Sequence, residues 1–187
     1  MSVTIKALTS PMPEIEQLRS VFAGALIVPG DADYDAARSV WNGMIDKYPA
    51  LIARCTCTAD VVAAVNFARE QQLVIAVRGG GHNVAGYATC DGGIVIDLSP
   101  MQEVRVDPAA RVAHVQGGAT WGVVDAATQV YGLAAPGGVF SDTGIAGLTL
   151  GGGYGWMRGL YGLSCDNLIA AEVVTAGGQI VHADENE

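Results

Sequence analysis

The chain has 187 residues, enough for one large domain or two small subdomains, and half of them are hydrophobic, which indicates a globular protein. Its 19 acidic residues outnumber the 10 basic ones and give a net charge of −9, which disfavours nucleic-acid binding. No stretch approaches the roughly 18 uninterrupted apolar residues of a membrane span. Because Met1–Ser20 also lacks an apolar signal core, we expect a cytoplasmic protein without a cleaved leader.

The first half of the chain alternates helices with strands. After Pro13, apolar residues recur at helical spacing over Glu14–Phe22, and acidic residues open a second helix over Asp33–Val40. A strand, a clearer helix and two further strands are then predicted over Leu51–Arg54, Thr58–Gln71, Val74–Val77 and Gly93–Leu98. This order predicts a βαβ unit in which the second strand runs directly into a glycine loop.

The second half favours antiparallel pairs. Its predicted elements are two paired strands, a helix capped by Thr120 and a hairpin closed by two glycines: Val104–Val106 with Val112–Val115, Thr120–Tyr131, and Val173–Thr175 with Gln179–His182. The mixture of βαβ and hairpins predicts an α+β fold of two α/β subdomains. We place them at residues 1–98 and 99–187, meeting near Leu98–Gln102.

The four cysteines do not indicate a metal site. Cys55 and Cys57 alternate on a strand, where small buried cysteines are common, and no second pair stands at zinc-binding spacing. Cys90 and Cys165 are isolated, and thiols in a cytoplasmic protein need no disulfide. We therefore predict no bound metal.

Glycine is the most informative residue type, with 25 copies that are concentrated in four clusters. The first cluster follows the predicted strand Val74–Val77 as Arg78-Gly79-Gly80-Gly81-His82-Asn83. Successive glycines let backbone amides converge on one point and bind an anion such as a diphosphate without lysines. The loop lacks the G-K-[ST] of a P-loop and the third glycine of a dinucleotide-binding fingerprint. A purely structural turn is the alternative for this loop taken alone.

His82 would lie beside a ligand bound by this loop. A neutral imidazole is a nucleophile, and an ordinary histidine pKa near 6.5 keeps much of it neutral at physiological pH. A histidine in a glycine loop more often serves only as a hydrogen-bonding group. His114 and His182 lie within strand patterns and are predicted to be structural.

Two further motifs follow. Gly137–Gly147, continued by Gly151–Gly155, lets a flat aromatic ring lie against the main chain, and the apolar residues between these glycines argue against a flexible linker. Tyr161–Leu168, taken alone, indicates only a turn and a cap ahead of the hairpin. The chain ends after a strand in Asp184–Glu187, which fits either a solvated acidic tail or a larger protein cut short.

Together and in this order, R-G-G-G-H-N, D-G-G-I-V-I-D-L, G-I-A-G-L-T-L-G-G-G-Y-G and Y-G-L-x-x-D-N-L resemble the PCMH-type FAD-binding domain of the vanillyl-alcohol-oxidase superfamily. Within it, they are similar to berberine-bridge-enzyme-like and 6-hydroxynicotine-oxidase-like oxidases, from about Tyr48 onward. The resemblance implies FAD as cofactor, bound covalently through its 8α-methyl to His82. Some members use a second cysteine link, but the aligned position here is Phe140.

The resemblance also implies which residues contact FAD. Diphosphate contacts are expected from Gly79–Asn83, and isoalloxazine contacts come from the later glycine motif. The full predicted set is Arg78, Gly79, Gly80, Gly81, His82, Asn83, Gly86, Tyr87, Gly138, Ser141, Thr143, Gly144, Gly147, Gly152, Gly155 and Asn167.

The implied function is that of an FAD-linked oxidoreductase, an oxidase that moves hydride from an alcohol, sugar, amine or natural-product substrate to flavin and then to oxygen. The family's substrate domain and catalytic base lie beyond the region of resemblance, so no catalytic residue is assigned. The partners are accordingly a small-molecule substrate, oxygen and a C-terminal substrate domain, and the 187 residues alone should be inactive. The alternative is a truncated, non-catalytic flavin-binding or structural module. A nicotinamide-dependent dehydrogenase is disfavoured because the dinucleotide fingerprint is missing.

Overall fold

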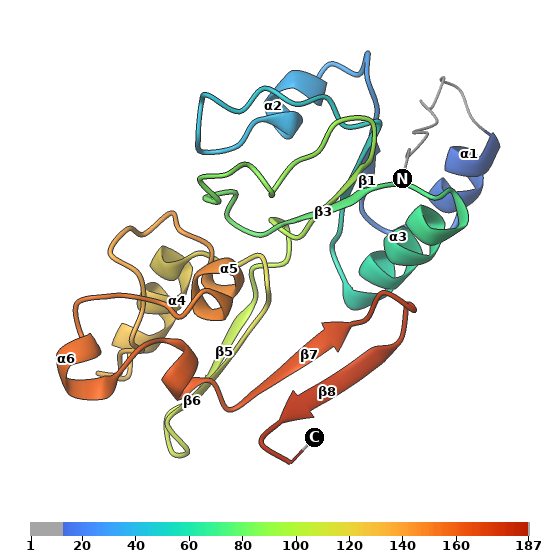
Figure 1. The fold of residues 1–187 in the computed structure, drawn as a ribbon. Coiled ribbons are helices and arrows are strands. Elements are labelled where there is room, and N and C mark those ends of the chain that lie inside the picture. Colours follow the sequence, from blue (N-terminus) through green and yellow to red (C-terminus); the bar gives the residue numbers. More distant parts are fainter. Residues whose placement is uncertain (1–12, 187) are drawn as a thin grey trace.

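A four-stranded sheet forms the centre of the first half of the molecule (Figure 1). The computed structural model describes residues 13–186, and its first-half elements are α1 (Pro13–Arg19), β1 (Ala25–Ile27), α2 (Tyr34–Arg38), β2 (Leu51–Arg54), α3 (Thr58–Glu70), β3 (Ile75–Arg78) and β4 (Ile94–Asp97). The strand order is β1-β2-β4-β3, with β1 antiparallel to β2 and the other pairs parallel. Because β3 and β4 run parallel, their carboxyl ends lie together at one edge of the sheet.

The core of the first half lies on both faces of this sheet. Successive side chains of a strand point to opposite faces, and the two inner strands are buried except for Arg54 at the end of β2. Leu51 and Ile94 pack with α1 and α3 on one face. Ile52 and Val95 pack with Tyr34 of α2 on the other. This two-sided burial explains why β2 and β4 appear in the sequence as continuous apolar runs rather than alternating patterns.

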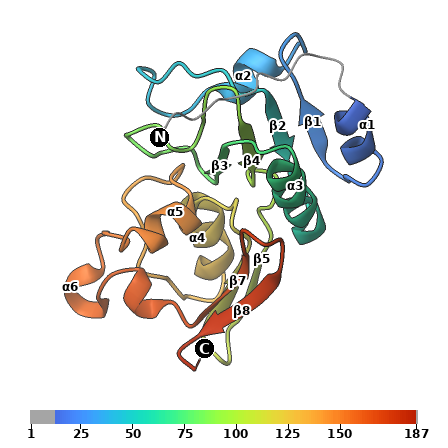
Figure 2. The ribbon, with the colours of Figure 1, turned by 45° about the vertical axis from the view of Figure 1, so that its right-hand side comes forward.

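The second half contains two hairpins and short helices, which form a separate lobe below the sheet in both views (Figures 1 and 2). Its elements are β5 (Val104–Asp107), β6 (Val112–Val115), α4 (Trp121–Gln129), α5 (Ile145–Leu150), α6 (Arg158–Tyr161), a 3₁₀ turn (Cys165–Asn167), β7 (Ala170–Val174) and β8 (Ile180–Asp184). β5 pairs with β6 and β7 with β8, both antiparallel.

The hairpin β7–β8 packs back against the first half. Val174 contacts the core beneath α3, and Thr58 Oγ1 donates to Glu172 Oε1 at 3.0 Å. Figure 2 shows this hairpin directly beneath the end of α3. The division into subdomains between residues 98 and 99 stays a prediction. The contacts of the β7–β8 hairpin with the first half join the two predicted subdomains.

The α+β class and the order of the main elements are confirmed. Several details differ from the prediction. β1 has only three residues, too few for a period to show, and α5 lies within the second glycine motif, where glycines conceal the apolar spacing. Helices α1 and α2 end earlier than predicted. Thr120 occupies the N-cap position of α4, but its side chain makes no capping hydrogen bond, so this part of the prediction was wrong.

Candidate cofactor site

The glycine loop leaves the carboxyl end of β3 with its backbone donors free. Among the hydrogen bonds found within residues 13–186, none uses the backbone N–H of residues 79–83 as donor. The carbonyl of Gly81, by contrast, accepts from Trp41 N at 3.2 Å. Gly81 takes a left-handed backbone conformation with φ of 72°. Free amides in a run of glycines are available to bind an anion.

Gly80 brings the two halves of the molecule into backbone contact. A Cβ atom at Gly80 would overlap the backbone nitrogen of Gly144 and lie 2.7 Å from its Cα. Gly144 is the N-cap of α5, and it is held by two flanking hydrogen bonds, from Trp121 N to Thr143 O at 3.0 Å and from Ile145 N to Ala119 O at 2.9 Å. Gly80 has no positive φ, so close approach rather than conformation requires glycine here.

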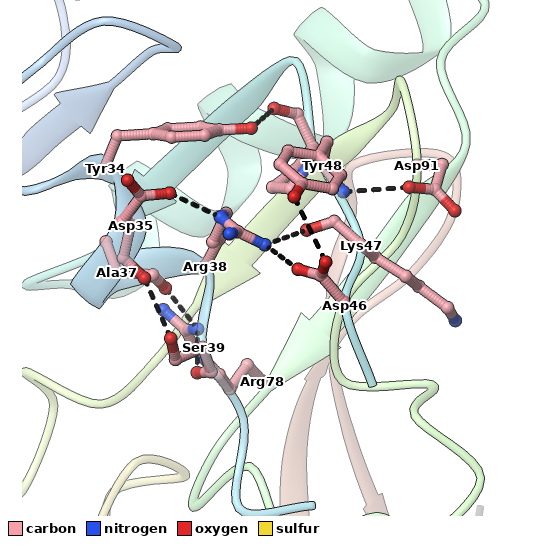
Figure 3. Close-up of polar contacts among 11 residues, drawn as sticks. Tyr34, Asp35, Ala37, Arg38, Ser39, Asp46, Lys47, Tyr48, Arg78 and Asp91 are labelled. Carbon is pink, nitrogen blue, oxygen red and sulfur yellow. Dashed lines mark hydrogen bonds and ion pairs between the residues drawn. The ribbon is translucent and has the colours of Figure 1, made fainter. Parts of the chain in front are cut away.

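Arg78 turns its guanidinium into the protein. It donates to Asp97 through Nε at 3.2 Å and Nη2 at 2.8 Å. It also donates to the carbonyls of Ala37 and Ser39 (Figure 3). Burial raises the pKa of Asp97, but the hydrogen bonds and charge of Arg78, with the Ser99 amide, outweigh it and hold the pKa below its usual value. Arg78 therefore supports the loop from behind and ties it to residues 37–39.

The segment 37–48 runs beside the loop and is fixed by polar contacts (Figure 3). Arg38 pairs with Asp35 and Asp46 and stacks on the Tyr48 ring at 4.1 Å. The hydrogen bonds from Arg38 and Tyr48 lower the pKa of Asp46. Tyr48 N also donates to Asp91 at 2.8 Å. These bonds hold the segment next to the connection between β3 and β4.

His82 lies between this segment and the second half. Its ring stacks on Trp41, with centroids 5.2 Å apart and planes at 21°. Its Nε2 is 3.5 Å from Asp142 Oδ2. The His82 side chain is one-fifth exposed, so one part of the ring remains reachable.

A pocket of about 350 Å³ opens at this point. It is lined by Ser39, Val40, Trp41, Arg78, Gly79, Gly80, Gly81, His82, Ser99 and Asp142. The structure thus brings together five of the predicted residues, 78–82, with Gly144 in backbone contact behind them. Trp41 and Asp142, along with the two serines and Val40, are missing from the predicted set. Asp142 stood within the second motif, whereas no motif marked residues 39–41.

The other predicted residues lie outside this pocket. Asn83, beside His82, accepts from Tyr87 N at 3.0 Å, and Tyr87 itself is exposed. Gly86 packs on Ile45. Asn167 donates to the carbonyls of Tyr161 and Leu163 at 2.8 and 2.9 Å, so its amide closes its own turn.

The remaining glycines and hydroxyls of the set lie between residue 138, ahead of α5, and residue 155, beyond it. Gly138 packs on Trp121 and Leu148, and Gly155 abuts the carbonyl of Gly137. The rest of this group comprises Ser141, Thr143, Gly147 and Gly152.

Neither metal ligands nor a membrane helix is found in the described part of the chain. Residues 13–186 contain no group of three or more His, Cys, Asp or Glu side chains placed to hold a metal ion. Cys55 and Cys90 are buried, and burial raises the pKa of Cys55 to about 12. No helix among these residues has the length and apolar character to cross a membrane.

Comparison with known proteins decides the family. The sequence profile of FAD_binding_4, described as an FAD binding domain, matches residues 49–184. The chain belongs to this FAD-binding family. The chain is 41% identical over 164 residues to (R)-6-hydroxynicotine oxidase of Paenarthrobacter nicotinovorans, a match that covers 88% of this chain and 36% of the oxidase.

Solved structures agree with this family. A berberine-bridge-enzyme-like protein of Physcomitrella patens superposes with a TM-score of 0.86 at 30% identity, over 92% of this chain and 38% of its own. A carbohydrate oxidase from Microdochium nivale gives a TM-score of 0.85 at 30% identity, over 93% and 38%. These matches confirm the resemblance and the PCMH-type fold. The chain spans about 36% of the length of the curated oxidase.

FAD is accordingly the cofactor of this domain, and the residues present fit it. The amides of residues 79–83, which donate no hydrogen bond within residues 13–186, can serve as donors to a diphosphate. Gly80 and Gly144 bring the backbones of the two halves together along a seam with no side chain between them. The relatives are FAD-linked oxidoreductases, which does not favour the non-catalytic alternative.

Proposed function

We propose that FAD lies along the seam between the two halves, with its diphosphate at the amides of residues 79–83. The observation that carries this proposal is the set of free N–H groups in that loop. The chain has only 10 basic residues, and Arg78, the nearest to the loop, is paired with Asp97. Backbone N–H groups must therefore form most of the hydrogen bonds to the diphosphate oxygens. The glycines from 138 to 155 then lie against the flat ring system.

His82 forms a covalent bond to the 8α-methyl carbon of FAD in this proposal. This reaction breaks one methyl C–H bond and one imidazole N–H bond and forms one C–N bond. The two electrons and two protons that it releases reduce oxygen to hydrogen peroxide. Support comes from the place of His82 in the pocket, where its ring is held by Trp41 and Asp142 yet remains partly exposed.

The activity proposed for the whole protein is oxidation of a small organic molecule. When bound, FAD supplies the hydride acceptor, and oxygen then takes the electrons. The residues described here bind and orient the cofactor, and none is assigned as catalytic acid or base. Among the relatives are a nicotine oxidase and a carbohydrate oxidase, so an alcohol, sugar, amine or natural-product substrate remains the proposed class.

The covalent bond is tested in the protein of full natural length. Wild type is expected to stay yellow after acid precipitation and to show an intact mass increased by one FAD less two hydrogens. His82→Ala should release all its flavin into the acid supernatant, whereas His114→Ala, which changes an exposed strand residue, should keep it. A folded, yellow wild type with the mass of the polypeptide alone would contradict the bond. A full-length protein that takes up no flavin at all would contradict the site.

The 187 residues produced alone are expected to turn over no substrate. They leave large apolar side chains exposed around α5 and α6, including Leu150, Trp156 and Leu160, so we also expect self-association and weak FAD binding. Oxygen consumption and gel filtration measure these outcomes. Peroxide production from an alcohol or sugar by this chain would mean that a catalytic base lies within it.

A further inference from the structure

Two residues outside the glycine loop hold the His82 ring from different directions. Trp41 covers one face of the imidazole, with centroids 5.2 Å apart. The carboxylate of Asp142 faces its Nε2 at 3.5 Å. Trp41 belongs to the segment 37–48, outside the part of the chain that matches the family profile, and Asp142 belongs to the second half. Neither residue belongs to the loop whose amides are proposed to bind the diphosphate.

The backbone fixes Trp41 beside the loop. Trp41 N donates to Gly81 O at 3.2 Å, directly before His82. On the other side of His82, Asn42 Nδ2 donates to Val84 O at 2.8 Å. Arg78 holds Ser39 O from behind. The tryptophan is therefore tied to the loop at both ends of the histidine that it covers, although its own side chain is 62% exposed.

The backbone also fixes Asp142. Ser141 O accepts from Gly122 N at 2.8 Å, and Thr143 N donates to Phe140 O at 3.2 Å. Two residues after Asp142, Gly144 meets Gly80 with no side chain between them. The backbone of Asp142 therefore stays beside His82 as long as the two halves remain in contact. Its side chain is 70% exposed, so a proton that it accepts can pass on to solvent.

We propose that Asp142 and Trp41 are positioning residues for the attachment of His82 to FAD. This inference rests on the covalent link proposed above. A neutral imidazole has one N–H and one lone pair, and a carboxylate beside Nε2 favours the proton there, which leaves the lone pair on Nδ1. Trp41 limits rotation of the ring and so keeps this lone pair in one direction.

Attachment joins FAD to His82 Nδ1 and releases two electrons and two protons. A methyl C–H bond of FAD breaks and a C–N bond forms from the 8α carbon to Nδ1. The Nε2 proton passes to Asp142 and on to solvent. Two electrons and a total of two protons reduce one oxygen molecule to hydrogen peroxide, so each attachment consumes one oxygen.

The experiment uses full-length protein prepared without flavin and then mixed with FAD in air. Intact mass measures covalent attachment against time, and equilibrium dialysis measures reversible binding before attachment. We expect Asp142→Asn to slow attachment by about 100-fold, as for loss of a positioned proton acceptor. Trp41→Leu should slow it by up to about tenfold, the effect of one aromatic stack. Rates are compared at saturating FAD, so a change in reversible binding does not enter the comparison.

Matched controls separate these effects from general damage. Asp125→Asn removes an exposed carboxylate from α4, and Tyr131→Leu removes an exposed aromatic side chain just after α4. Both should attach FAD at the wild-type rate. Asp142→Glu keeps the carboxylate and should recover most of the rate that Asp142→Asn loses, which also covers the case in which the asparagine variant folds poorly.

The outcomes are distinguishable. If wild type attaches FAD and Asp142→Asn attaches it equally fast, this inference is wrong and the covalent site stands. If Asp142→Glu is as slow as Asp142→Asn, the carboxylate is not the acting group, and attachment through Nε2 in the wild-type flavin peptide would also overturn the inference. If wild type never attaches FAD, the proposed function fails at His82 itself.

Discussion

The two halves of the molecule are stabilised in different ways. In the first half, Leu51, Ile52 and Ile94 are fully buried between helices and sheet. In the second half, Leu150 and Leu160 are 82% and 85% exposed, and close backbone approach takes the place of a large core. A Cβ at Gly155, for example, would overlap the carbonyl oxygen of Gly137. The first half thus has the buried core of an ordinary domain, whereas the second half leaves apolar side chains exposed and available for contact with a ligand or another domain.

This difference matches the different roles of the two halves in the proposed site. The rigid sheet of the first half presents the loop at residues 79–83, so the diphosphate donors are fixed before any ligand binds. The apolar surface of the second half lies where the proposed flavin ring and a substrate domain would cover it. A surface of this kind on a soluble protein indicates a binding face.

The largest expected effect comes from a side chain placed where the halves meet. Gly80→Val should abolish flavin retention in the full-length protein, because its Cβ would overlap the backbone of Gly144 and force the seam apart. Gly43→Val is the control, since a Cβ there meets no atom within 4 Å. Flavin absorbance per polypeptide after gel filtration measures the outcome. Normal flavin content in Gly80→Val would show that the loop is only a turn.

Two substitutions to alanine, one in each half, compare how much a side chain of each half contributes to the free energy of unfolding. Ile96→Ala empties a fully buried position of β4 and should lower the free energy of unfolding by about 2–5 kcal/mol. Leu160→Ala removes an exposed side chain and should change it by less than about 0.5 kcal/mol. Urea unfolding followed by circular dichroism gives both values. Similar losses for the two variants would mean that the second half has a core of its own.

How far the sequence predicts this arrangement depends on the type of signal. Short apolar runs locate β2 and β3, and helical spacing locates α3, because the two strands belong to one sheet and α3 packs on its face. The three-residue β1 and the glycine-rich α5 have no such period. Trp41 and Asp142 reach His82 only through the folding of distant segments, so local sequence patterns carry no sign of their contact with it. The inward direction of Arg78 likewise depends on Asp97, which stands at the end of another strand.

Acid should act first on the first half. Asp97 and Asp60 are both buried there, and in each case burial raises the pKa but hydrogen bonds outweigh it and leave the pKa below its usual value. A carboxyl with a depressed folded pKa contributes stability above its unfolded pKa of about 3.9 and loses it as pH falls through the folded pKa. The free energy of unfolding should therefore be steady above about pH 5 and fall below about pH 4.

Variants at Asp97 test this assignment by urea unfolding at several pH values. Asp97→Asn should be less stable than wild type at pH 7, because it leaves Arg78 buried without its charge partner, yet lose less stability between pH 5 and pH 3. Asp125→Asn, at an exposed position of α4, should keep the wild-type acid dependence. An unchanged slope in Asp97→Asn would place the acid sensitivity elsewhere.

The smallest expected effect concerns the hairpin β7–β8, which belongs to the second half in sequence but packs on the first. Glu172 accepts from Thr58 at 3.0 Å in an exposed position, so Glu172→Ala should lower global stability by only about 0.5 kcal/mol, the low end for one hydrogen bond. Hydrogen exchange is more sensitive, because local opening of a docked hairpin does not require unfolding of the core. Amides of β7 and β8 should exchange faster in Glu172→Ala, while those of β2 and β4 stay unchanged. His182→Ala, opposite Glu172 in the hairpin register, should leave both sets as in wild type. Faster exchange throughout the sheet would instead make the hairpin an integral part of the first half, and the boundary between the halves would then not lie at a single point in the chain.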